Sequence, residues 1–94
     1  MDDTVLIMLQ YDLGELFPSE DRLAYLRQNI AAAREMIGRE GVVLGEGSED
    51  VQLVEMYAAY LVRKRASSEG MPRMLRWALN QKLFSQKAQV QNGV

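Results

Sequence analysis

The apolar run near the middle of the chain constrains the fold more than any other feature. Within residues 48–65 the apolar side chains would cover nearly the whole circumference of a helix: Val51, Leu53, Val54, Met56, Tyr57, Ala58, Ala59, Tyr60, Leu61 and Val62. A helix that is apolar on every side is enclosed by neighbouring elements. The segment therefore predicts a central helix that begins at Ser48, carries acids in its first turn and is surrounded by other helices.

Two helices are predicted before this segment. Apolar residues recur at spacings of three and four over residues 4–16, which indicates a first helix. A second and clearer helix is opened by Pro18 and Ser19, and Arg39 and Gly41 mark its end. Both helices have an apolar face to bury against the central one.

The rest of the chain predicts a loop and one more helix. Three glycines within residues 40–50 favour a loop with a short extended piece. Pro72 suits the first turn of a final helix, and it is followed by Leu75, Ala78, Leu79 and Leu83. We therefore expect an all-α bundle of three to four helices that forms one domain over residues 1–94, with residues 86–94 as a flexible tail.

The composition limits the chemistry that the chain can perform. The 94 residues include no cysteine and no histidine, which removes disulfides, thiolate and imidazole metal ligands and the commonest general base. We expect no cofactor, no metal and no enzymatic activity, in a reducing compartment. The apolar runs, such as residues 5–9 and 56–62, are far shorter than the ~20 residues of a membrane-spanning helix. The acidic start differs from a secretory signal, so we expect a protein that is neither secreted nor embedded.

The charges are segregated along the chain. Residues 1–55 hold twelve acids and four arginines, for a net charge of −8, whereas residues 56–94 hold seven bases and one acid, for a net charge of +6. Helix dipoles explain part of this pattern. The rest predicts two complementary partner surfaces, a basic one of Arg63, Lys64, Arg65, Arg73 and Arg76 and an acidic one of Asp12, Glu15, Glu20, Asp21 and Glu49.

Two other functions fit parts of the sequence. The basic residues suit a small helical DNA-binding regulator that reads the major groove with Arg73 and Arg76, but a pI near 5.1 and the lack of a reading motif count against it. An enzyme that uses a pair of carboxylates would need two acids close together. No such pair stands at helical i, i+3 or i+4 spacing within an apolar face.

One long segment resembles a known family. The run VEMYAAYLVRKRASSEGMPRMLRWALNQKLF at residues 54–84, preceded by REGVVL at residues 39–44, is similar to the head-to-tail connector proteins of long-tailed bacteriophages and prophages. The similar pattern extends over most of the chain: a helix ending near REGV, a glycine-rich acidic loop, a helix that closes in basic residues, and a last helix carrying LNQKLF.

The resemblance implies a structural role in virion assembly. Connectors of this family are small helical proteins that form a ring under the portal and join the head to the tail. The expected partners are further copies of the chain, arranged head to tail, with the portal protein and a tail or stopper protein, and packaged DNA as a non-specific contact. The expected location is the virion, or the bacterial cytoplasm during assembly.

Overall fold

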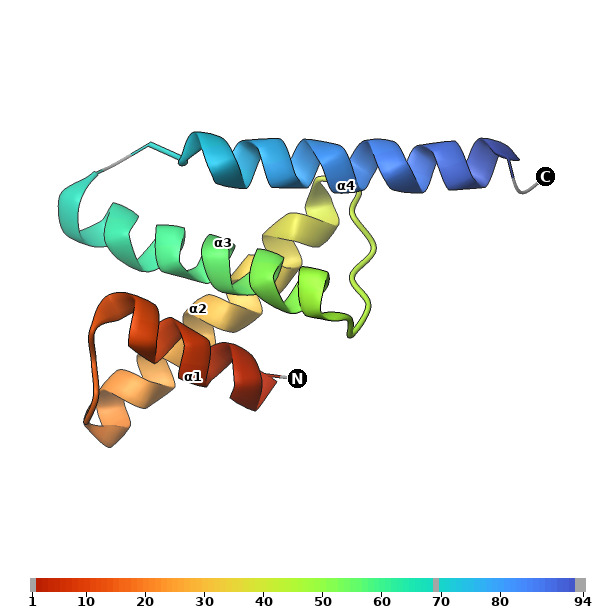
Figure 1. Ribbon diagram of the computed structural model, residues 1–94. Helices are drawn as coiled ribbons and strands as arrows, with labels where there is room; N and C mark the ends of the chain where they lie inside the picture. Colours follow the sequence, from red (N-terminus) through yellow and green to blue (C-terminus); the bar gives the residue numbers. More distant parts are fainter. Residues whose placement is uncertain (1, 69, 93–94) are drawn as a thin grey trace.

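The computed structural model describes residues 2–68 and 70–92, which form four helices and no strand. The helices are α1 (Asp2–Leu13), α2 (Glu20–Arg39), α3 (Ser48–Ser67) and α4 (Arg73–Asn92). Figure 1 shows α1 below α3, α2 running diagonally from the lower left past α3 up to α4, and α4 lying across the top of the molecule. The predicted all-α bundle is confirmed.

Helix α3 is the centre of the structure. It packs against α1, α2 and α4, and its buried residues come from most of its circumference: Asp50, Leu53, Val54, Glu55, Tyr57, Ala58, Ala59 and Val62. The core is completed by fully buried side chains from the neighbouring helices, among them Leu9, Leu26, Ile30 and Leu79. The prediction from the apolar run is therefore confirmed.

Helix α1 ends earlier than the sequence predicts. Gly14 has a φ of +72°, its N–H donates to the Tyr11 carbonyl, and the Glu15 N–H donates to the Gln10 carbonyl. This pair of bonds is the Schellman pattern, in which a glycine in the left-handed conformation closes the last turn. The expected helix over residues 4–16 is wrong at its end, and Leu16 lies in the turn between α1 and α2.

The predicted signals at both ends of α2 are confirmed. The Ser19 side chain accepts a hydrogen bond from the Arg22 N–H at 3.1 Å, as expected for an N-cap. At the other end Gly41 adopts a φ of +98°, and its N–H donates to the Gly38 carbonyl. Gly41 therefore turns the chain from α2 toward α4.

Two glycines near this end of α2 are expected to respond oppositely to alanine. A Cβ at Gly41 would lie 3.3 Å from the Leu83 Cδ1 atom and would occupy a left-handed backbone, so Gly41→Ala should lower the free energy of unfolding by about 1–3 kcal/mol. Gly38 lies within α2, and a Cβ added there would have no neighbour within 4 Å, so Gly38→Ala should raise it by about 0.5–1 kcal/mol. Urea unfolding of both variants checks the pair, and equal effects would contradict the backbone argument.

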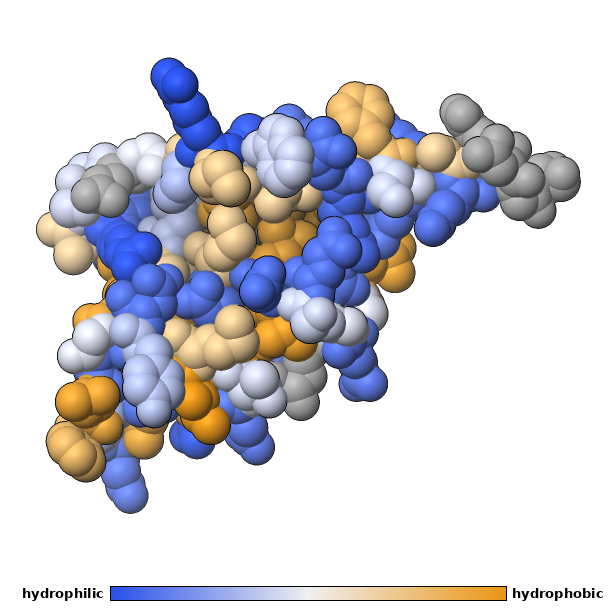
Figure 2. All heavy atoms as spheres, viewed as in Figure 1, coloured by the Kyte–Doolittle hydropathy of each residue, from blue (hydrophilic) through white to orange (hydrophobic). Residues whose placement is uncertain are grey.

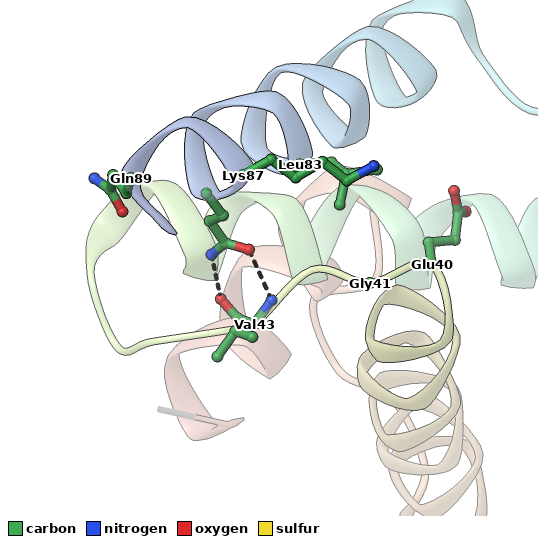
Figure 3. A pocket seen from close by; sticks show the side chains of 7 residues that line it. Glu40, Gly41, Val43, Leu83, Lys87 and Gln89 are labelled. Atoms are coloured by element: carbon green, nitrogen blue, oxygen red, sulfur yellow. Dashed lines mark hydrogen bonds between the residues drawn. The ribbon is translucent and has the colours of Figure 1, made fainter. Parts of the chain in front are cut away.

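Helix α4 is longer than the sequence predicts. The expected end lies near Gln86, but the helix continues to Asn92, and residues 93–94 lie outside the described part of the chain. The Gln86 side chain accepts a hydrogen bond from the Val43 N–H at 3.0 Å and donates one to the Val43 carbonyl at 2.7 Å. Figure 3 shows this pair joining α4 to the loop after α2. The helix therefore includes residues 86–92, whereas their flexibility stays a prediction.

Candidate interaction surfaces

Among the described residues nine large apolar side chains are exposed, and six of them fall into two groups on different parts of the fold, whereas Ile7, Met36 and Val43 lie outside both. At the α1–α2 turn Tyr11, Leu16 and Phe17 are exposed, and Phe17 retains 97% of its accessible surface. Along α4, Met74, Trp77 and Phe84 are exposed. In Figure 2 apolar atoms gather at the lower left, where the turn lies in Figure 1, and again along α4 at the top. We call these groups the turn knob (Tyr11, Leu16, Phe17) and the α4 stripe (Met74, Trp77, Phe84).

A groove runs beside the α4 stripe, between α3 and α4. Its volume is about 470 Å³, and its lining is mostly apolar at the end near Met74 and polar at the end near Lys82. The lining residues are Glu49, Gln52, Leu53 and Met56 from α3 and Met74, Trp77, Ala78, Gln81, Lys82 and Ser85 from α4. Two methionines give this groove an adaptable wall, because the thioether side chain is flexible and polarizable.

A second groove lies on the other side of α4, against the loop after α2. It has a volume of about 900 Å³ and is lined by Leu83, Gln86, Lys87 and Gln89 of α4 and by Glu40, Gly41 and Val43. Figure 3 shows the Gln86–Val43 hydrogen bonds across it. The lining offers side-chain amides and one cation, without a cluster of groups that converge on one point.

The two oppositely charged halves of the chain pair with each other inside one molecule. Arg63 contacts Asp12 at 3.1 Å and Lys82 contacts buried Asp50 at 2.8 Å. Arg76 makes a two-pronged contact with Glu40, at 2.6 and 3.2 Å. Three of the seven bases in the second half are thus neutralised by acids of the first half. The charge segregation in the sequence therefore overstates the charge available to a partner.

The predicted basic surface is divided by these contacts. Arg63 and Arg76 are held in the ion pairs just described, and Lys64 and Arg65 stand over aromatic rings, at 5.7 Å from the Tyr60 centroid and 5.6 Å from the Tyr25 centroid. Within the described part of the chain Arg73 has no ion pair and is exposed. Of the five predicted bases, Lys64, Arg65 and Arg73 therefore have no ion pair among the described residues, and Arg73 alone of these three has no aromatic ring contact there.

The predicted acidic surface is also divided. Asp12 is paired with Arg63, and Glu15 accepts two hydrogen bonds from Arg22, at 2.8 and 2.6 Å, which lower the pKa of Glu15. Glu20 and Asp21, in the first turn of α2, have no ion pair among the described residues. Glu49 lies elsewhere, in the wall of the α3–α4 groove. The acids free near the turn knob are thus Glu20 and Asp21.

A buried carboxyl group beside an exposed one escaped the sequence analysis. Glu55 of α3 is 7% exposed and lies beside Asp12 of α1, whose side chain is exposed. Burial, followed by hydrogen bonding to Asp12, raises the pKa of Glu55 to about 8. Two carboxyl groups can bond to each other only when one carries a proton, so Glu55 is protonated at neutral pH. The search for acids on one helix face missed the pair because the two carboxyls come from different helices.

The arrangement around this pair is structural. The Arg63 guanidinium donates to the Asp12 carboxylate and, at 3.3 Å, to the Asp12 carbonyl at the end of α1. A carboxyl pair with separated pKa values resembles an acid–base pair, but neither Asp12 nor Glu55 lines the grooves of about 900, 500 and 470 Å³. The cluster therefore ties α1 to α3, and the expected lack of catalysis stays a prediction.

Membrane-spanning helices and metal sites are not found among the described residues. Among residues 2–68 and 70–92, no helix combines the length and apolar character needed to cross a membrane. In the same residues, no three acidic side chains gather where they could hold a metal ion.

Comparison of the chain with protein-family models, with curated proteins and with solved structures gives no match. The connector resemblance therefore stays a prediction, and the function has to be argued from the surfaces of the subunit.

Proposed function

We propose that this protein is a structural adaptor of a bacteriophage or prophage particle, which assembles into a ring that joins the portal to the tail. The proposal combines the sequence pattern of residues 39–44 and 54–84 with the surfaces described above. Further copies of the chain, the portal protein and a tail or stopper protein are the proposed partners.

The observation that carries the proposal is the pair of exposed apolar surfaces on different parts of one small subunit. A ring requires two different, complementary patches on every copy. The turn knob and the α4 stripe are two such patches (Figures 1 and 2). Contiguous exposed apolar surface of this kind usually marks a protein–protein contact.

The size of the subunit is compatible with this role. The accessible surface is 6337 Å², and an ordinary contact covers about 800 Å² on each partner. Two contacts would then cover about a quarter of the surface. A chain this small gains much of its buried apolar area through assembly, so we expect the isolated subunit to be of modest stability.

Mass photometry and negative-stain microscopy of the purified protein, alone and mixed with the portal protein of the same phage or prophage, test the proposal. We expect closed rings of one subunit number, either in the free protein at high concentration or on the portal. A protein that stays monomeric alone and does not bind the portal would contradict the proposal.

The alternative role as a DNA-binding regulator has less support. Arg76, one of the two arginines expected to read bases, is held by Glu40 in two hydrogen bonds. A gel-shift titration with duplex DNA at increasing salt distinguishes the roles. Sequence-specific binding that persists at about 0.2 M salt would favour the regulator, because non-specific phosphate contacts weaken steeply there.

A further inference from the structure

We infer that the turn knob of one subunit inserts Phe17 into the α3–α4 groove of the next copy of this chain. The inference rests on the proposed ring and names the two surfaces that make its repeating contact. The occupant of the groove is thus a second copy, and the contact is heterologous because knob and groove are two different surfaces of each subunit. The turn between α1 and α2 lies at the lower left of Figure 1, and α4 lies across the top.

Phe17 is unusually exposed for a large apolar side chain. Its side chain is 97% exposed, although burial of a phenyl ring is worth about 1.5–3 kcal/mol. Pro18 follows it directly and fixes its own φ, and the Ser19 cap holds the start of α2. Leu16 beside it is 68% exposed. The turn therefore presents a constrained apolar projection that no contact within the subunit uses.

The α3–α4 groove is large enough to hold a phenyl ring. A cavity of about 150 Å³ is sufficient to bind benzene, and the groove measures about 470 Å³, enough for a phenyl ring with part of Leu16. Its apolar end is formed by Leu53, Met56 and Trp77. Trp77 is 59% exposed and offers a ring for aromatic contact, the kind of residue that dominates interface energetics.

The charges beside the groove and beside the turn knob are of opposite sign. Arg73 directly precedes Met74 at the apolar end of the groove and has no ion pair among the described residues. Glu20 and Asp21 follow Phe17 by three and four residues and also lack an ion pair in that part of the chain. Insertion of Phe17 would bring these opposite charges together. Rim charges of this kind set orientation and encounter rate.

The surface areas are of the right order. A fully exposed aromatic side chain offers about 150–250 Å², so the turn knob presents roughly 400 Å² of apolar surface. That is about half of the ~800 Å² that each partner contributes to an ordinary contact. About half of such a contact is apolar, so knob and groove supply the apolar part and the rim charges belong to the rest.

Cysteine cross-linking tests the contact, and the natural absence of cysteine makes it specific. The chain carrying both Leu16→Cys and Gln81→Cys should form a ladder of disulfide-linked dimers, trimers and larger species on mild oxidation. Neither single variant should form it, and a mixture of the two should give dimers with one chain of each kind. The control pair places the first cysteine at Ala31, an exposed position about three turns further along α2, and should give no ladder.

Further substitutions in the cross-linking chain test the residues. Phe17→Ala should slow ladder formation at least tenfold, whereas Val43→Ala should leave it unchanged, because Val43 is exposed but belongs to neither apolar patch and does not line the groove. Arg73→Glu should slow it severalfold, and Asp21→Lys in the same chain should restore it. Circular dichroism should show all these variants folded, since the altered side chains are exposed.

The outcomes separate the inference from the proposed function. No ladder in concentrated protein, or self-dimers of the Leu16→Cys single variant, would overturn the inference even if rings form on the portal. A ladder that depends on Phe17, in a protein that never binds the portal, would support the contact and contradict the connector function.

Discussion

Replacing Glu55 with glutamine is expected to remove most of the pH dependence of stability between about pH 4.5 and pH 8. In the folded protein the pKa of Glu55 is raised from the ordinary value of 4.5 to about 8, first by burial and then by its hydrogen bond to Asp12 and by the Asp12 charge, with Arg63 opposing. The unfolded chain has none of these influences. In the folded protein the proton on Glu55 is therefore retained over a range where the unfolded chain loses it.

The sign follows from proton linkage. Where the folded state binds more protons than the unfolded state, the free energy of unfolding falls as pH rises. The contribution of Glu55 to the free energy of unfolding is fully present below about pH 4.5 and is lost as the pH rises toward 8. The loss is at most about 5 kcal/mol, because each unit of pKa shift corresponds to ~1.4 kcal/mol. Glu15 acts oppositely at lower pH, because Arg22 lowers its pKa and that contribution is lost on acidification. We expect maximal stability near pH 5.

Thermal and urea unfolding from pH 4.5 to pH 9 check this prediction. Glutamine keeps the shape of Glu55 and can donate to Asp12 without binding a proton, so the variant should have a nearly flat profile and exceed the natural protein at pH 8. Glu46→Gln, at an exposed position without an ion pair in the described structure, is the matched control and should follow the natural protein. Parallel profiles for the Glu55→Gln variant and the natural protein would show that Glu55 is ionised in the fold.

The second large effect is expected at Leu79, where alanine should release α4 from the other three helices. Leu79 is 1% exposed, and truncation of a buried leucine costs about 2–5 kcal/mol. Helix α4 packs mainly on α3, whereas α1, α2 and α3 all pack on one another. We therefore expect α4 to open as a separate unit while the three-helix core stays folded.

Native-state hydrogen exchange distinguishes this local opening from global unfolding. In Leu79→Ala, amides of α4 should exchange about 30-fold to 5,000-fold faster, the factors that correspond to about 2–5 kcal/mol, with much smaller changes in α2 and α3. The control Leu26→Ala removes a fully buried side chain from the core of α2 and should accelerate exchange in all four helices. Equal acceleration throughout the Leu79→Ala protein would mean that α4 unfolds only with the rest.

Local signals in the sequence are sufficient to predict the helical class and most helix ends. Ser19 and Gly41 act through neighbouring backbone groups, so their effects can be read from adjacent residues. The predicted end of α1 is too late because Gly14 does not merely weaken the last turn but closes the helix in a left-handed conformation. The length of α4 is not predictable in this way, since Gln86 is held by Val43, 43 residues away in the sequence.

The surfaces are less predictable than the helices. Charge segregation suggests two facing patches, but it cannot show that Arg63 meets Asp12 within one subunit. Which charges remain free depends on how the helices pack. The sequence does hold one signal for the pair of Glu55 and Asp12. Glu55 is the single acid within the mostly apolar residues 51–62, and an acid at such a position needs a partner.

The hydrogen bonds between Gln86 and Val43 have a consequence for solubility. Val42, Val43 and Leu44 form a short β-branched and apolar run, and an exposed extended backbone of this composition is a template for pairing with the same segment of another molecule. The Gln86 amide binds both the N–H and the C=O of Val43, as a neighbouring strand would. Val43 is 75% exposed, yet its backbone is already occupied. Through these two bonds we expect helix α4 to limit strand-mediated pairing of this segment between molecules.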